Sequence, residues 1–139
     1  MQELRMEKTA GLAREADVWL GGTLLTVCDG ISTGARKTPP GPIEQVAFRI
    51  HRDEGLEWAD AVAANPSHRR ILESENSWRY IGFGRIEQVM PVRIDFGILT
   101  LDDPTWSTDE NLVGAYVAVP IDRLELIPEA DADWPEEMK

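Results

Sequence analysis

The chain has 139 residues with one cysteine, Cys28, and its 25 acidic residues outnumber 14 Lys and Arg, giving a formal net charge of −11. Such a charge repels phosphate backbones and anionic lipid, so we expect neither nucleic-acid nor membrane binding. One thiol cannot form an internal disulfide, and no basic start with an apolar run indicates a secretory signal, so the sequence predicts a cytoplasmic protein.

The first half of the chain predicts an arm followed by two strands. Residues 1–16 contain helix-forming residues but few apolar ones, which is typical of a marginal helix or a mobile arm. Residues 17–29 are largely apolar and predict the first strand. The segment 30–42 is rich in Gly and Pro and predicts a loop. Residues 43–51 alternate apolar and polar positions, the pattern of a half-buried strand.

The second half predicts one helix and then further strands. Residues 54–64 place apolar side chains at helical spacing behind an acidic first turn. From Trp78 onward the chain alternates again, and Gly82 and Gly84 within one strand indicate curvature. We therefore expect an α+β fold in which a strongly curved antiparallel sheet, or a small β-barrel, of about six strands carries one main helix.

The same patterns predict the domain organisation. A single β-rich domain spans residues 17–127, preceded by the arm at 1–16. An acidic, proline-interrupted tail follows at 128–139.

A phosphate-binding loop is suggested by Gly30, Gly34, Lys37 and Thr38, which follow the first predicted strand. The spacing differs from the G-x-x-x-x-G-K-[ST] pattern that wraps phosphates. Two prolines follow directly, so no helix can begin there to place its positive end at an anion. The segment is interpreted as a connector.

Metal and nucleophile sites are also disfavoured. His51 and His68 flank the predicted helix at its two ends, and the acidic turn lacks the spacing of a calcium loop. Cys28 ends an apolar strand, where a thiol is usually an inert hydrophobe, and a hairpin through the 30–42 loop would place it near Ile43, away from His51. We expect no metal, no cofactor and no catalytic residue, and we favour a non-enzymatic role.

The positions of the tryptophans lead to the main functional hypothesis. Two of the five, Trp106 and Trp134, lie in polar, acidic surroundings where burial is hard to arrange. Exposed aromatic side chains are enriched where proteins bind partners. The predicted surface docks a protein with a basic face, as an accessory protein, inhibitor or assembly subunit, and comprises Trp106, Trp134, Asp102, Asp103, Asp109 and Glu110.

Two alternatives stay open. One is a β-barrel that binds a small molecule, with possible acid–base chemistry from Arg93, Asp95 and His51; the strand alternation favours an exterior position for the first two. The other is a structural subunit of a larger homomeric or viral-type assembly, in which the chain associates with itself.

Overall fold

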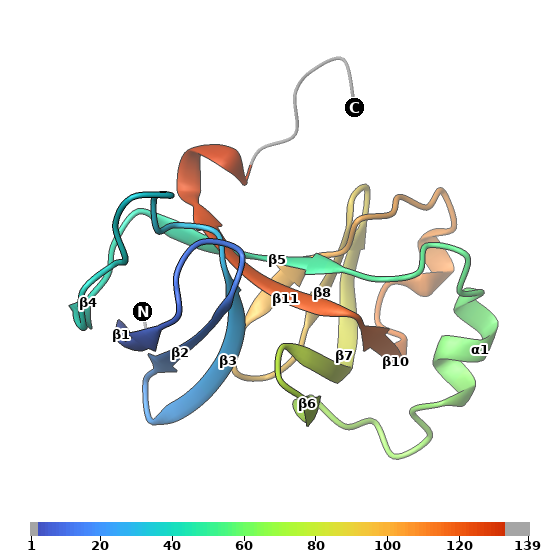
Figure 1. The fold of residues 1–139 in the computed structure, drawn as a ribbon. Helices are drawn as coiled ribbons and strands as arrows, with labels where there is room; N and C mark the ends of the chain where they lie inside the picture. Colours follow the sequence, from blue (N-terminus) through green and yellow to red (C-terminus); the bar gives the residue numbers. More distant parts are fainter. Residues whose placement is uncertain (1–2, 133–139) are drawn as a thin grey trace. The chain divides into compact units, whose positions relative to one another are not determined.

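The structure is a computed structural model that describes residues 3–132, and these residues are mostly β (Figure 1). One short helix, α1 (Trp58–Ala63), and two 3-10 helices, η1 (Glu110–Leu112) and η2 (Glu129–Asp131), accompany the strands. The strands are β1 (Leu4–Thr9), β2 (Glu15–Leu20), β3 (Thr23–Asp29), β4 (Gly41–Pro42), β5 (Val46–His51), β6 (Ile71–Asn76), β7 (Arg79–Val89), β8 (Val92–Asp95), β9 (Thr100–Asp102), β10 (Tyr116–Ile121) and β11 (Arg123–Pro128).

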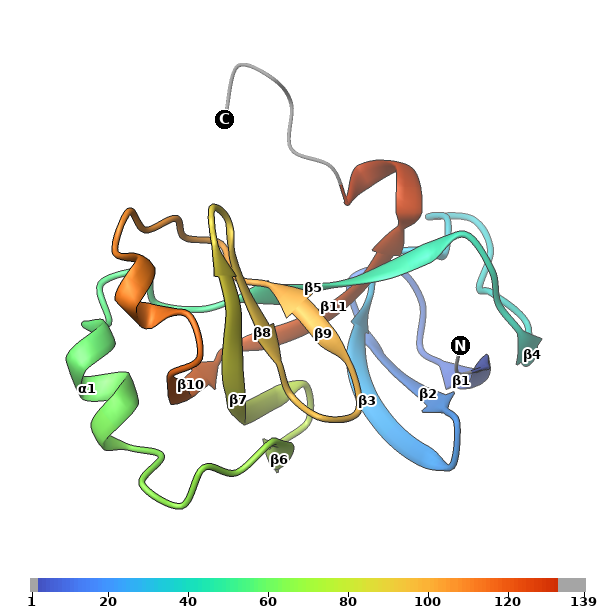
Figure 2. The ribbon, with the colours of Figure 1, turned by 180° about the vertical axis from the view of Figure 1, so that it is seen from behind.

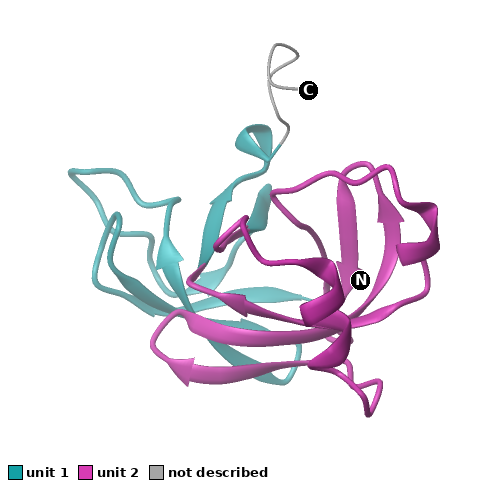
Figure 3. Cartoon of the chain, turned by 90° about the vertical axis from the view of Figure 1, so that its right-hand side faces the viewer, with its two compact units in different colours: residues 1–49, 124–139 teal, residues 50–123 magenta. Residues whose placement is uncertain are grey.

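The strands form two sheets, which can be followed from both sides in Figures 1 and 2. The first has six strands in the order β4-β1-β2-β3-β11-β5, and it is mixed because β3 and β11 run parallel. The second has five antiparallel strands in the order β10-β7-β8-β9, with β6 also paired to β7. The chain divides into two compact units, residues 1–49 with 124–139 and residues 50–123 (Figure 3).

The core of the first unit is built from the inner face of its antiparallel strands. Met6, Val18 and Leu25 lie opposite one another across β1, β2 and β3, and each is at most 3% exposed. The β2–β3 connection is a two-residue turn at Gly21 and Gly22, and Gly21 has a φ of 58°, which glycine adopts without strain. The Gly-Gly pair therefore makes a hairpin where the sequence predicts one strand.

The second unit is organised around β7, its longest strand. β10 pairs with one edge of β7, whereas β6 and β8 pair with successive parts of the other edge. Gly82 and Gly84 lie on the buried face of β7. A Cβ atom at Gly82 would lie 2.5 Å from Cε1 of Phe96, and one at Gly84 would lie 2.5 Å from Cγ2 of Ile94. The two glycines thus make room for fully buried side chains of the β8 region.

The expected fold class is wrong. Among residues 3–132 there are two sheets, one of them mixed, and no closed barrel. The strand glycines do not close a barrel, because they accommodate Phe96 and Ile94 instead. The main helix is also much shorter than expected: the side chain of Asp53 accepts a hydrogen bond from the Gly55 N–H, which forms a turn before α1 begins.

Other predicted segments differ in detail. The region expected to be an arm or marginal helix contains β1 and the start of β2. The register of β1 against β2 shifts between Met6 and Lys8, so apolar and polar residues alternate imperfectly along β1. No hairpin passes through the 30–42 loop, because β3 has β2 and β11 as its neighbours. The predicted strand at 43–51 is confirmed in its larger part by β5. Within the described part of the chain, no helix has the length and apolar character required to cross a membrane.

A substitution of Gly82 by Ala tests the close approach of Phe96. We expect Gly82→Ala to lower the free energy of unfolding by about 1–3 kcal/mol, because the added methyl group would overlap a buried ring. Denaturant titration measures this, and Gly34→Ala is the control, since a Cβ there meets nothing within 4 Å. Equal effects of the two substitutions would contradict the packing described for β7.

Candidate functional site

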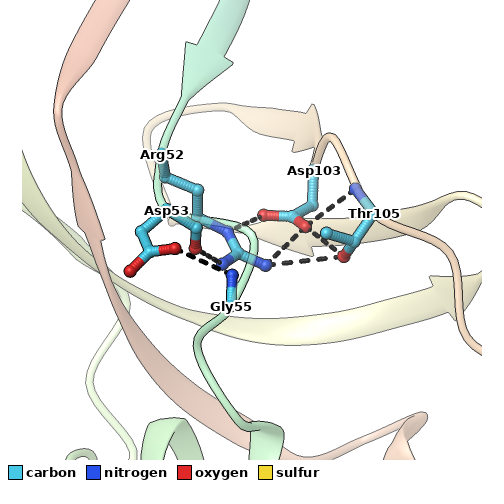
Figure 4. Close-up of polar contacts among 5 residues, drawn as sticks. All are labelled: Arg52, Asp53, Gly55, Asp103 and Thr105. Carbon is cyan, nitrogen blue, oxygen red and sulfur yellow. Dashed lines mark hydrogen bonds and ion pairs between the residues drawn. The ribbon is translucent and has the colours of Figure 1, made fainter.

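A buried ion pair lies beneath the acidic turn of the second unit (Figure 4). Arg52 directly follows β5, and Asp103 directly follows β9. The guanidinium donates from Nε to Oδ1 and from Nη2 to Oδ2 of Asp103, the second bond being 2.7 Å long. The two side chains are 1% and 0% exposed. This two-bond geometry is the strongest arrangement available to an Arg–carboxylate pair.

Neighbouring groups satisfy the rest of both side chains. Arg52 Nη1 donates to the carbonyl of Asp53 at 2.7 Å, and its guanidinium carbon lies 5.1 Å from the centre of the Trp58 ring. Asp103 also accepts hydrogen bonds from the backbone N–H and the hydroxyl of Thr105. Because burial of an ion pair is costly unless its remaining donors and acceptors are occupied, these contacts fix the start of the turn in place.

Trp106 projects from the turn that this network holds. The backbone on either side of it bonds to the tip of the β7–β8 hairpin: the Ser107 N–H donates to Val89 O at 2.8 Å, and the Val92 N–H donates to Thr105 O at 3.0 Å. Trp106 is nevertheless 49% exposed, and Met90 at the hairpin tip is 58% exposed. Two large apolar side chains are therefore presented to solvent by adjoining, hydrogen-bonded turns.

The acidic residues predicted for this surface differ in their exposure and in their partners. Asp103 is inside the protein, so it supports the turn and is not available to a partner. Asp102 is about half exposed and pairs with Arg93 at 2.7 Å. Asp109 and Glu110 are exposed, and Asp109 accepts the Asn111 N–H at the start of η1. Trp134 lies outside the described residues.

The residues of the alternative ligand site each have a different partner. Arg93 pairs with Asp102, and Asp95 pairs with Arg70 at 2.8 Å on the exposed face of β8. His51 Nε2 lies 3.2 Å from Nη2 of Arg123. A cavity of about 520 Å³ lies in the first unit, lined by Lys8, Thr9, Ala10, Glu15, Asp17 and Thr26. None of these six is an aromatic or a large aliphatic residue, the kinds of side chain that usually line ligand pockets.

Asp29 organises the loop that resembles a phosphate-binding segment. The carboxylate is fully buried and accepts hydrogen bonds from the backbone N–H groups of Ile31 and Ser32 and from the hydroxyls of Ser32 and Thr9. The Ser32 hydroxyl in turn accepts from the Thr38 N–H at 2.9 Å. The N–H groups that a phosphate would need are thus already donated to a carboxylate of the chain itself.

His68 and Cys28 each lie beside residues of their own unit. His68 stacks on Tyr116 with ring centres 4.4 Å apart. Cys28 is buried in β3, opposite Glu15 on β2 and Glu125 on β11. Within residues 3–132, no three His, Cys, Asp or Glu side chains are grouped so that they could hold a metal ion.

Comparison of the chain with models of protein families, with curated proteins and with solved structures gave no match.

Sequence reasoning missed two residues of this site. Arg52 has no local signal, because its partner is 51 positions away in the sequence. Met90 is recognisable as part of a break before Pro91, but the pairing of its turn with the turn that contains Trp106 has no signal in the sequence. Both are consequences of tertiary structure.

Two adjacent carboxylates provide a matched test of the buried pair. We expect Asp103→Asn to lower the free energy of unfolding by about 3–5 kcal/mol, because Arg52 would stay buried without a counter-charge. Asp102→Asn removes the partner of an exposed arginine and should cost less than about 1 kcal/mol. Denaturant titration of both variants checks this, and similar losses would contradict a special role for Asp103.

Asp29 predicts a specific dependence of stability on pH. Burial raises the pKa of Asp29, but hydrogen bonds from Ser32, Thr9 and the Ile31 N–H outweigh burial and hold this pKa below its ordinary value of 3.8. A carboxylate with a lowered pKa stabilises the fold above the unfolded-state pKa, and this stabilisation is lost as the pH falls below about 3.8 through the folded-state pKa.

Asp29→Asn should remove this dependence. The difference in free energy of unfolding between the native chain and Asp29→Asn is expected to shrink between about pH 5 and pH 2. Denaturant titrations at intervals across that range measure it. A difference that stays constant over the range would show that folding leaves the pKa of Asp29 unchanged, and a difference that grows as the pH falls would show that folding raises this pKa.

Proposed function

We propose that the chain is a non-enzymatic protein-binding module that docks a partner with a basic face through the surface formed by Met90, Trp106, Asp109 and Glu110, here called the Trp106 surface. The observation that carries this proposal is the half-exposed indole of Trp106 on a turn anchored by a buried ion pair. Large aromatic side chains are the commonest energetic centres of protein interfaces.

The anchoring of the turn supports a binding role. A loop that is already ordered loses little conformational entropy when a partner binds, so more of the contact energy appears as affinity. Here the residue before Trp106 contacts Asp103, and the backbone of Ser107 bonds to β7. A solvent-facing tryptophan held in this way is suited to contact a partner without rearrangement.

The charge of the chain indicates the chemistry of the partner. A net charge of −11 attracts a positively charged surface over a distance of about one Debye length and disfavours acidic partners. Asp109 and Glu110 follow Trp106 closely in the sequence, are exposed, and can pair with Lys or Arg of the partner. We expect such a complex to weaken as salt is added, and we place it in the cytoplasm.

Substitution of Trp106 tests the proposal. Trp106→Ala should weaken partner binding by about 2 kcal/mol or more, roughly 30-fold, while leaving the melting temperature unchanged because the indole is half exposed. The chain is used as bait in an extract of its own host at low salt, and the captured partner is then titrated against purified variants.

Leu24→Ala is the matched control, since Leu24 is 46% exposed and lies in the other unit. It should leave binding intact. A partner that binds the Trp106→Ala chain as tightly as the native chain would overturn the proposal, and so would affinity that rises with salt.

A further inference from the structure

β5 is an edge strand of the six-stranded sheet, and its one charged residue other than histidine, Arg49, is paired with Glu125. Its sequence is VAFRIH, six residues with no proline, lysine or acidic residue. Exposed edges present unpaired backbone groups that can pair with another chain, so proteins commonly shorten, cover or charge them. An unprotected edge of this length is a candidate interaction surface.

The directions of the backbone groups in β5 follow from its hydrogen bonds. The carbonyl of His51, the last residue of β5, accepts from the N–H of Asp122, which directly precedes β11, at 2.9 Å, so the odd-numbered residues of β5 direct their N–H and C=O groups toward β11. Alternate residues of a strand point these groups to opposite edges. Val46 and Phe48 therefore direct theirs away from β11, and both side chains are only half-buried.

The other sheet edges are protected. β4 has two residues and ends in Pro42, and β9 has three residues. β10 is covered by α1, and its Val117 carbonyl accepts a hydrogen bond from the Asn65 side chain at 3.0 Å. β6 carries Glu73 and Glu75, whose charges oppose pairing with a like strand. Among these edges, only β5 has six residues with β-branched and aromatic side chains and has neither proline nor an acidic residue.

We propose that β5 is the interface through which the chain binds a second copy of itself, by antiparallel pairing about a two-fold axis at Ala47. In this register Val46 lies opposite Phe48 of the second copy, which is a favourable pair of β-branched and aromatic side chains. Arg49 of the second copy lies beyond the start of β5, near the uncharged Gln45, so no like charges face each other. A two-fold axis at Arg49 would instead oppose two arginines.

Arg49 does not need a new partner in this dimer, because it already donates to Glu125 at 2.9 Å. The pairing joins identical patches, as in most homodimers, and extends the sheet across the axis. Each copy carries a formal net charge of −11, so the two copies repel each other at long range. Added salt screens this repulsion and should strengthen the dimer, which is opposite to the salt effect expected at the Trp106 surface. The two proposals can therefore fail separately.

Amide hydrogen exchange and sedimentation test the dimer on the native chain. As protein concentration rises, we expect a monomer–dimer transition together with at least tenfold slower exchange of the Val46 and Phe48 amides. The Ala47 and Arg49 amides, which face β11, should be protected at every concentration. A chain that stays monomeric to millimolar concentration, with freely exchanging Val46 and Phe48 amides, would overturn the proposal.

A charge variant gives a second readout. Ala47→Arg would place two arginines opposite each other at the axis and should keep the chain monomeric, whereas Thr23→Arg adds the same charge at an exposed position of β3 and should leave the dimer intact. Circular dichroism checks that both variants fold. A dimer that persists in Ala47→Arg, with the Val46 and Phe48 amides still unprotected, would place the interface elsewhere.

Discussion

The buried pair of Arg52 and Asp103 is the constraint on which the proposed site depends. Charged side chains that are 1% and 0% exposed are tolerated only if they remain paired, so any movement of the acidic turn that separated them would leave an uncompensated charge inside the protein. The pair thereby joins the end of β5 to the start of the turn. Because Trp106 follows Asp103 by three residues, the ion pair also holds the backbone of Trp106 in place, while its side chain remains half exposed.

The sequence predicted those features that local pattern controls. Strict alternation in Val46, Phe48 and Ile50 gave β5, and alternation in Val92 and Ile94 gave β8. The helix was overestimated because helical spacing outweighed Gly55 and the turn that Asp53 forms. The barrel was inferred from glycines within strands, but a glycine pattern indicates only that space is needed. It does not show whether a sheet closes or a ring such as Phe96 fills that space.

At the candidate site, local sequence pattern predicts even less of the structure. Asp102 and Asp103 are adjacent and chemically identical, yet one lies on the surface beside Arg93 and the other is enclosed with Arg52. Periodicity could suggest that they face opposite sides of a strand, but it could not name Arg52 as a partner 51 positions away. The exposure of Trp106 was predicted from the polar, acidic residues around it and agrees with its exposed fraction of 49%, whereas the pairing of its turn with the β7–β8 hairpin has no signal in the turn's own composition.

Footprinting with hydroxyl radicals can show whether a partner covers the Trp106 surface, because tryptophan and methionine side chains are both readily oxidised. The partner is captured at low salt, and oxidation of each residue is measured by mass spectrometry in the free and bound protein. We expect oxidation of Trp106 and Met90 to fall severalfold on binding while that of Leu24 is unchanged. If Trp106 is oxidised equally in the free and bound protein, the Trp106 surface is not where the partner binds.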